Sequence, residues 1–202
     1  MTKSHFTLNK ALQGFTILDV YIFLAASLFI WVVFTVLEPH VSSKKGKSWI
    51  VMLQTSAILS GFGIHAYLTT EQSGLWKLDH VYDESLISRC VVLFFVSANV
   101  MDLFLGVLYY PSFLDPLTTI FHHIFYLVFM AVLLKCNYSR GFLLCFFMEI
   151  PTFILALGSA FKELRSDLSF GVSFLITRVI YNAYLAFRLY CLSPEGKIYT
   201  TI

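Results

Sequence analysis

Charged residues are scarce in this sequence: Asp, Glu, Lys and Arg together make up 13% of its 202 residues. A water-soluble domain carries about a quarter of its residues as charged side chains, whereas 58% of the residues here are hydrophobic. The chain therefore has too little polar surface to cover a globule in water. A lipid bilayer is the solvent that fits this composition.

The sequence also lacks the patterns of several other protein classes. Its 14 basic and 12 acidic residues form no basic tract interleaved with aromatic residues, which excludes a nucleic-acid-binding protein. Its four cysteines form no C-x-x-C pair and no metal-ligand spacing with histidine, so we expect them to be packing residues. We find no internal repeat and no inverted half-to-half similarity of the transporter kind. We expect neither a bound metal nor a resident cofactor.

Hydrophobic runs long enough to cross a membrane are present instead. A hydrocarbon core roughly 30 Å thick requires about 20 helical residues. The sequence therefore predicts an all-α fold: a polytopic transmembrane helix bundle of about six spans around a lipid-accessible polar cavity. The first run lacks a cleavage pattern, so we interpret it as a retained anchor and not as a signal peptide. The predicted spans are residues 20–37, 49–69, 88–110, 117–135, 141–161 and 169–192.

The runs and their connectors divide the chain into three parts. Residues 1–48 form an N-terminal anchor helix with a basic loop, residues 49–192 form the main helix bundle, and residues 193–202 form a short tail. The basic loop contains Lys44, Lys45 and Lys47, which favours a cytosolic loop and a lumenal N-terminus. The sum of positive charge over all connectors favours the opposite orientation.

Three charged side chains fall deep inside the predicted spans, away from their ends: Asp102 in the third, Glu149 in the fifth and Arg178 in the sixth. An ionised group at the centre of a bilayer costs roughly 2.5 to 3.5 kcal/mol, so each must be neutralised, paired or hydrated. We expect Arg178 to pair with Glu149 or Asp102, because this pairing cancels charge and gives the planar guanidinium a carboxylate to bind.

Helical spacing predicts that further polar side chains converge with these three in one water-poor cavity. Residues three or four apart share a helix face. A histidine pair also begins the fourth span, and because adjacent imidazoles point in different directions on a helix, one of them should face inward. The shared faces hold Asn99 with Asp102, Glu149 with Thr152 and Arg178 with Asn182, while the fourth span adds His122, His123 and Tyr126.

These polar residues admit a structural and a functional interpretation. A buried charge pair can serve only to fix helix packing. An imidazole beside a buried acid and an arginine is also a candidate proton acceptor or lipid-headgroup contact. Nearby, Pro151 removes a backbone hydrogen bond and should kink the helix beside Glu149. His65, which follows Gly61 and Gly63, is expected to cap a close helix contact.

The chain carries a series of short motifs in order: Met101-Asp102-Leu103-Phe104-Leu105-Gly106, Tyr110-Pro111, Asp115-Pro116, Phe121-His122-His123, Met148-Glu149-Ile150-Pro151-Thr152 and Phe174-Leu175-Ile176-Thr177-Arg178. This series resembles the TLC-domain family, which includes the ceramide synthases. The resemblance covers roughly residues 49–190. It implies a bundle of six or seven helices enclosing a lipid-accessible cavity, in the endoplasmic reticulum or a related membrane.

The resemblance also assigns roles to some of these residues. In ceramide synthases a histidine pair and a later aspartate pair are required for transferring an acyl group from acyl-CoA to a sphingoid amine. By resemblance His122 and His123 match the histidine pair. The aspartate pair is not matched, because the corresponding helix offers Glu149 and Thr152, as in the branch without established synthase activity. Relatives usually continue past the sixth span into another helix, whose absence would leave the cavity open.

Three functions follow from these observations. In the first, the protein serves lipid metabolism or membrane lipid homeostasis by binding a polar lipid in the cavity. In the second, it is a sphingosine N-acyltransferase-like enzyme that uses acyl-CoA as co-substrate. The third, an endoplasmic-reticulum trafficking or cargo-binding protein, has little support because the tail carries no dilysine or KDEL-type signal.

Each function names its own residues and partners. Membrane lipids are the expected partners, including a sphingoid base or acyl-CoA for the enzyme, and a homodimer is left open. The expected catalytic residues are His122, His123 and Glu149, and the expected ligand-binding residues are Asn99, Asp102, Tyr126, Thr152, Arg178 and Asn182.

Overall fold

A computed structural model of the chain describes residues 15–72 and 85–192. The regular elements within these ranges are all helices. Six helical segments are long and apolar enough to cross a membrane, which confirms the predicted polytopic helix bundle. The segments are Ile17–His40, Lys44–Thr70, Leu86–Tyr109, Pro116–Cys136, Ser139–Ala160 and Asp167–Arg188. The predicted tail at residues 193–202 lies outside the described residues.

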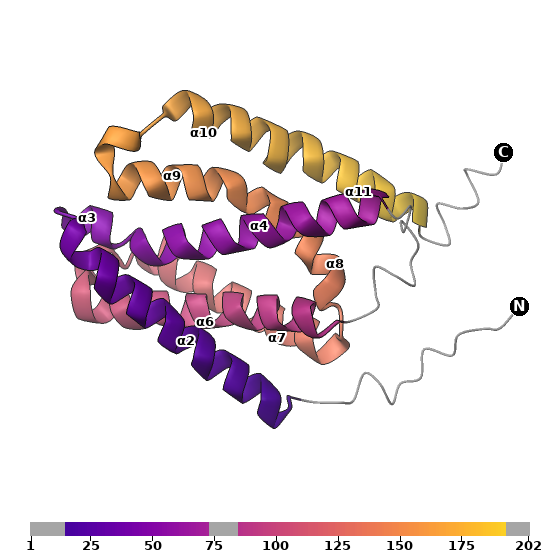
Figure 1. Cartoon of the computed structure of the whole chain (residues 1–202), viewed down its shortest axis with the longest axis horizontal. Coiled ribbons are helices and arrows are strands. Elements are labelled where there is room, and N and C mark those ends of the chain that lie inside the picture. Colours follow the sequence, from indigo (N-terminus) through magenta and orange to yellow (C-terminus); the bar gives the residue numbers. More distant parts are fainter. Residues whose placement is uncertain (1–14, 73–84, 193–202) are drawn as a thin grey trace, which may run out of the picture.

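The helices lie side by side in one bundle (Figure 1). Helix α4 (Ile50–Gln72) runs through the middle and packs against α6 (Leu86–Tyr109) on one side and α9 (Ile150–Ala160) on the other. Helices α2 (Ile17–Leu37) and α7 (His122–Cys136) pack on α6, and α10 (Asp167–Phe174) packs on α9. The remaining elements are η1 (Glu38–His40), α3 (Lys44–Lys47), η2 (Pro111–Phe113), η3 (Pro116–Phe121), α8 (Ser139–Leu143), η4 (Leu144–Glu149), η5 (Lys162–Leu164), η6 (Leu175–Ile180) and α11 (Tyr181–Leu192).

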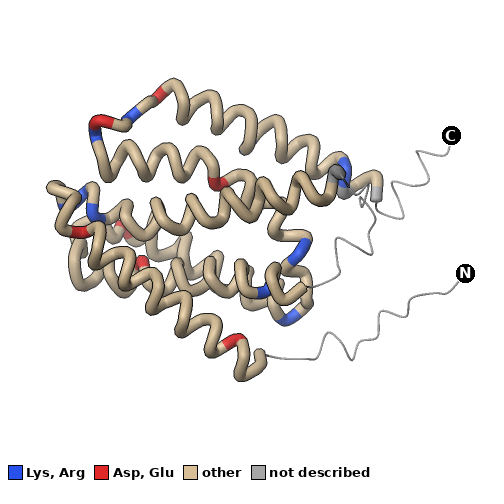
Figure 2. Tube along the Cα trace, viewed as in Figure 1, with Lys and Arg blue, Asp and Glu red and all other residues tan. Residues whose placement is uncertain are grey.

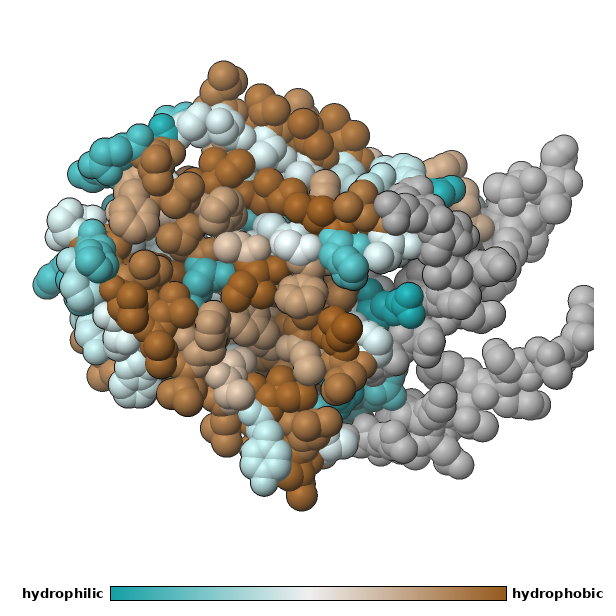
Figure 3. Space-filling view, viewed as in Figure 1, coloured by the Kyte–Doolittle hydropathy of each residue, from teal (hydrophilic) through white to brown (hydrophobic). Residues whose placement is uncertain are grey.

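The outer surface of the bundle is apolar along most of its length. Large hydrophobic side chains on the outward faces are exposed, among them Leu28 on α2, Val128 on α7 and Val179 on η6. Figure 3 shows hydrophobic residues covering most of one face of the molecule. Such an exterior matches the acyl chains of a bilayer, which are as apolar as these side chains.

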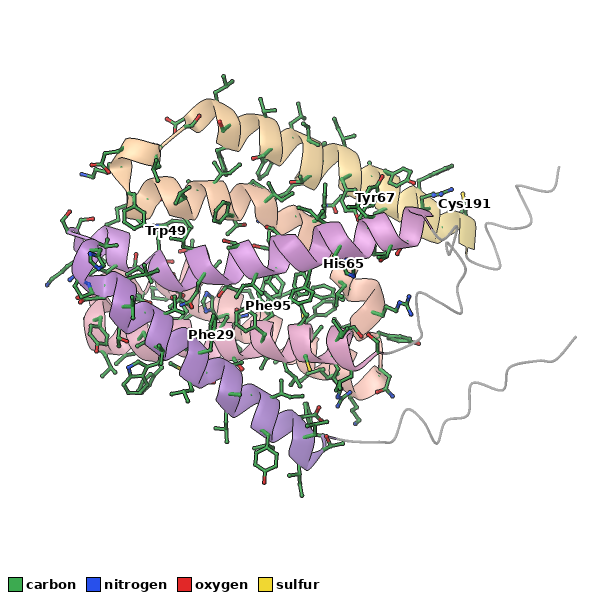
Figure 4. All side chains as sticks on the ribbon, viewed as in Figure 1. Phe29, Trp49, His65, Tyr67, Phe95 and Cys191 are labelled. Carbon is green, nitrogen blue, oxygen red and sulfur yellow. The ribbon has the colours of Figure 1, made fainter. Side chains whose placement is uncertain are left out.

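Aromatic side chains pack α4 and α6 against the later helices. The Phe95 ring on α6 stands edge-on to Phe146 of η4, with ring centroids 5.5 Å apart. Tyr67 on α4 meets Tyr181 of α11 in a similar way at 5.7 Å. Figure 4 shows Phe95 and Tyr67 on their two helices. Aromatic pairs of this geometry add to the area that they bury, so they set how the neighbouring helices sit.

The start of α2 is held by a buried ion pair that the sequence did not reveal. Thr16 and Asp19 form a capping box, in which the Asp19 carboxylate accepts a hydrogen bond from the Thr16 amide at 2.6 Å. Asp19 is only 3% exposed. Its two carboxylate oxygens also bind Arg89 of α6, at 2.6 Å from Nε and 2.8 Å from Nη2. Arg89 Nη1 donates to the Leu134 carbonyl at 3.2 Å, so this one guanidinium joins α2, α6 and α7.

Three of the spans depart from α-helical geometry beside a polar residue singled out above. The π-helical turn η3 ends just before His122, the 3₁₀ segment η4 ends at Glu149, and the π-helical turn η6 contains Arg178. Irregular turns of this kind inside helices often accompany functional sites. The first of these turns, η3, has an N-terminal cap: the Asp115 carboxylate accepts hydrogen bonds from the amides of Leu117 and Thr118. Hydrogen bonds from Thr118 hold the pKa of the Asp115 carboxyl below its usual value.

The closest approach of α4 to η4 depends on Gly63. A Cβ added at this position would lie 2.9 Å from the Phe147 Cα, among backbone atoms that cannot rotate away. We therefore expect Gly63→Ala to lower the free energy of unfolding by about 1–3 kcal/mol, as other overpacked cores do. Gly61 on the same helix has no atom within 4 Å of such a Cβ, so Gly61→Ala should be neutral or stabilising by about 0.5–1 kcal/mol. Unfolding of the two variants in detergent micelles measures the difference, and equal effects would contradict the close contact.

Candidate functional site

Asp102 lies in a closed polar network between α6 and α7. Asp102 is 5% exposed. One carboxylate oxygen accepts a hydrogen bond from the Tyr110 hydroxyl at 2.8 Å, and the other lies 3.5 Å from His123 Nε2. Tyr110 reaches back because the chain turns directly after the end of α6. We call Asn99, Asp102, Tyr110 and His123 the inner network.

His123 is held at both of its ring nitrogens. Nδ1 lies 3.2 Å from the Asn99 carbonyl oxygen, which can only accept a hydrogen bond, so Nδ1 carries a proton. Nε2 faces Asp102. A proton shared between Nε2 and the carboxylate would leave the pair without net charge, as a buried pair inside a membrane span requires. His123 is 6% exposed while His122 is exposed, and this confirms that one histidine of the pair faces inward.

Arg178 lies in a second group of polar residues, between η4, α9 and η6. Its Nη2 donates to Thr152 Oγ1 at 2.7 Å and its Nε donates to the Met148 carbonyl at 3.2 Å. The guanidinium also lies over the Phe174 ring at 5.6 Å. Glu149 forms a hydrogen bond with the Thr152 side chain and interacts electrostatically with Arg178. Thr152 therefore connects the acid to the base.

This arrangement corrects the expected pairing of Arg178. The pairing with Asp102 is wrong, because the nearer partners Tyr110 and His123 already occupy that carboxylate. Among residues 15–72 and 85–192, Arg178 forms no ion pair with Glu149 within 4 Å either. The two interact at longer range and through the hydroxyl that lies between them.

Some of these contacts are made by backbone carbonyls of the interrupted helix before Pro151. Proline has no amide hydrogen, and the 3₁₀ segment η4 precedes it, so the helix is interrupted beside Glu149 as predicted. Carbonyls of this segment accept hydrogen bonds from side chains of the sixth span instead. Met148 binds Arg178 in this way, and Leu144 accepts from the Tyr181 hydroxyl at 3.0 Å.

Residues of α7 and α11 complete the second group. The exposed His122 ring stands edge-on to Tyr126 at 4.8 Å, and it interacts electrostatically with Arg178. Tyr126 in turn interacts with Glu149 and Arg178. The Asn182 amide donates to the Met148 sulfur at 2.7 Å and to the Arg178 carbonyl at 2.9 Å. We call His122, Tyr126, Glu149, Thr152, Arg178 and Asn182 the outer cluster.

Polar side chains from separate helices do lie together, but they form two groups and not the single water-poor cavity that the sequence predicted. Asn99, Asp102 and His123 lie in the inner network, and the other six expected site residues lie in the outer cluster. The adjacent His122 and His123 join the groups, with ring centroids 5.8 Å apart. Sequence reasoning missed Tyr110 as a partner of Asp102, because it placed the tyrosine inside the third span, two turns from the aspartate, whereas α6 ends at Tyr109 and the chain turns there.

The outer cluster combines a cation, an acid, an imidazole and hydroxyls on a partly exposed surface. Such a set can bind a polar group that carries both charge and hydrogen-bonding atoms. Comparison with known proteins identifies one family: a model described as the TLC domain matches residues 45–201. No curated protein and no solved structure matches the chain.

Proposed function

This chain belongs to the TLC-domain family, and from this premise we propose that it handles a membrane lipid whose polar group binds at the outer cluster. Its apolar helical segments make it an integral membrane protein. The family is associated with membrane lipids, and the proposed location is the endoplasmic reticulum or a related membrane. The proposed role is in lipid metabolism or membrane lipid homeostasis.

The observation that carries the proposal is the state of Arg178. This residue lies 11 positions after Asp167, the start of its span, and thus about 16 Å into the membrane. Its side chain is exposed, and with the described residues it forms no ion pair within 4 Å and no hydrogen bond from Nη1. A cation at this depth is costly unless an anion meets it. A lipid phosphate or carboxylate has two oxygens that can accept hydrogen bonds from one guanidinium at the same time.

The other residues of the outer cluster suit the rest of a polar lipid group. Glu149 and the Tyr126 hydroxyl interact with one another and with Arg178. They can accept hydrogen bonds from a hydroxyl or amine on the same lipid. Asn99 and Asp102 are buried and already hydrogen-bonded within the protein. In this proposal they hold α7 in position and do not contact the lipid.

Arg178→Gln tests this binding function. Hydrogen bonds to charged groups contribute enough that losing one weakens binding by roughly tenfold or more. We expect wild-type protein to co-purify with one enriched polar lipid class and Arg178→Gln to lose that enrichment. Lipid analysis of the purified proteins, compared with the bulk membrane, measures it.

A matched control separates this site from general loss of charge. Arg165 pairs with Asp167 on the surface and lies outside the outer cluster, so Arg165→Gln should keep the wild-type lipid profile. A wild-type lipid profile equal to that of the bulk membrane would contradict the proposed binding function.

Acyl transfer is the second candidate, and the state of His122 favours it. This imidazole is exposed and forms no hydrogen bond with any described residue. Both ring nitrogens of His123 already face partners within the protein. His122 is therefore the histidine that can accept a proton from an attacking amine or hydroxyl. That lipid nucleophile would form a bond to the acyl carbon of acyl-CoA as the CoA thiolate leaves. Purified protein incubated with acyl-CoA and a panel of sphingoid amines would then release free CoA thiol, and the absence of product would exclude this candidate.

A further inference from the structure

A cavity with both polar and apolar walls lies at one end of the bundle, away from the outer cluster. It has a volume of about 210 Å³ and lies between the end of α4, the start of α6 and helix α8. A cavity needs only about 10–15 Å³ to hold one water molecule, so this one accommodates a group of many atoms. Its lining includes His65, Thr69, Ser85 and Arg140.

Arg140 and His65 face this cavity, and neither side chain has a partner among the described residues. Arg140 is half-buried, and it forms no ion pair or hydrogen bond within residues 15–72 and 85–192. His65 was expected to cap a helix contact, but its side chain is exposed and lines the cavity instead. Figure 4 shows His65 on the stretch of α4 that passes α8. The guanidinium offers five N–H donors and the imidazole at least one more.

Most of the rest of the cavity wall is apolar. Phe62 and Ala66 of α4 and Leu143 and Leu144 of the fifth span lie on the lining beside the polar residues. A site with cationic donors on one part of its wall and hydrocarbon on another matches an amphipathic ligand with an anionic group. A free inorganic anion would leave the apolar part of the wall without a partner.

The depth of the cavity agrees with such a ligand. Arg140 is the second residue of its span, and thus lies at the level where a bilayer keeps its phosphates. Glu149 follows nine residues later, about 14 Å deeper, so the cavity is separate from the outer cluster. Figure 2 shows Lys and Arg gathered where α6, α7 and α8 meet. Basic residues at a membrane surface attract anionic lipids.

We propose that this cavity binds an anionic phospholipid, with the lipid phosphate on Arg140 and His65 and an acyl chain along Phe62, Ala66 and Leu143. The bound lipid would be a resident one at the membrane surface, distinct from the lipid handled at the outer cluster. Its charge would neutralise Arg140, and its chain would cover the apolar wall between α4 and α8.

The test uses the full chain carrying Arg178→Gln, which removes the proposed lipid binding at the outer cluster. Delipidated protein is exposed to micelles that contain phosphatidylserine and phosphatidylcholine in equal amounts, and native mass spectrometry measures the lipid that stays bound. We expect this protein to retain phosphatidylserine in preference to phosphatidylcholine. Adding Arg140→Gln should lower the retained phosphatidylserine by about tenfold, because the charge-assisted hydrogen bonds to phosphate are lost.

The matched control is Lys135→Gln, which removes a positive charge from an exposed residue at the same end of the bundle that does not line the cavity. It should leave lipid retention unchanged, and all three variants should keep the same unfolding midpoint. Unchanged retention in Arg140→Gln would overturn the proposal and indicate that the guanidinium pairs with another part of the chain. Displacement of the lipid by millimolar inorganic phosphate would also overturn it, since it would indicate a site for free anions.

Discussion

Replacing His123 with alanine should lower the free energy of unfolding by about 3–5 kcal/mol, because the buried Asp102 carboxylate then loses the group that balances its charge. The neighbouring His122 is exposed and forms no hydrogen bond with a described residue. His122→Ala should therefore change the same free energy by no more than about 0.5 kcal/mol. Unfolding in detergent micelles, followed by circular dichroism, measures both variants.

A double replacement distinguishes the charge effect from a simple loss of packing. Buried ion pairs can often be exchanged for apolar residues at little cost, whereas removal of one partner is expensive. Asp102→Leu combined with His123→Leu should recover most of the stability that His123→Ala loses. If His122→Ala and His123→Ala destabilise the protein equally, the division into an inner network and an outer cluster is wrong. If the protein is an acyltransferase, His122→Ala should abolish product while the fold stays intact.

Replacing Arg89 with glutamine should have an effect of similar size. The buried Asp19 carboxylate would lose two hydrogen bonds to a guanidinium, and breaking such a pair costs about 3–5 kcal/mol. Arg89→Lys should retain the charge but lose the two-point contact, so we expect an intermediate loss. The predicted consequence is detachment of α2 from α6 and α7, measured as a lower unfolding midpoint and faster proteolysis near the start of α2.

Lys135→Gln is the matched control for this variant. Lys135 is exposed at the end of α7, close in sequence to the Leu134 carbonyl that Arg89 binds. Its replacement should leave stability within about 0.5 kcal/mol of wild type. A loss below about 1 kcal/mol in Arg89→Gln would place the ion pair among ordinary surface pairs and contradict its burial.

The six spans could be predicted because the thickness of the hydrocarbon core sets the length of each hydrophobic run. The observed ends differ from the predicted ones by a few residues where a capping side chain decides them. The first span begins at Ile17 and not at residue 20, since Thr16 caps the helix and Asp19 closes the capping box. A hydrophobicity pattern places Asp19 outside the span, whereas the cap and Arg89 give it a place inside.

The faces shared within single helices were also predictable. Glu149 and Thr152 form a hydrogen bond as their spacing indicates, and Asn182 donates to the carbonyl of Arg178 one turn earlier. Partners on different helices were not predictable, because spacing along one helix does not say which other helix faces it. Charge alone favoured Arg178 as the partner of Glu149 or Asp102, but a histidine and a tyrosine lie against Asp102 in the structure.

The π-helical turn around Arg178 has a consequence for the angular phase of the sixth span. A π turn holds one residue more than an α turn, so the chain after Ile180 is rotated by about 100° relative to an uninterrupted α-helix. After this rotation the side chains of Tyr181 and Leu185 point into the bundle, and both are buried. Deleting a single residue from Leu175–Ile180 would remove the inserted residue and swing both side chains out toward the acyl chains. The residues before and after this turn thus place their hydrophobic side chains on different faces of the helix, and the change of face occurs at Arg178.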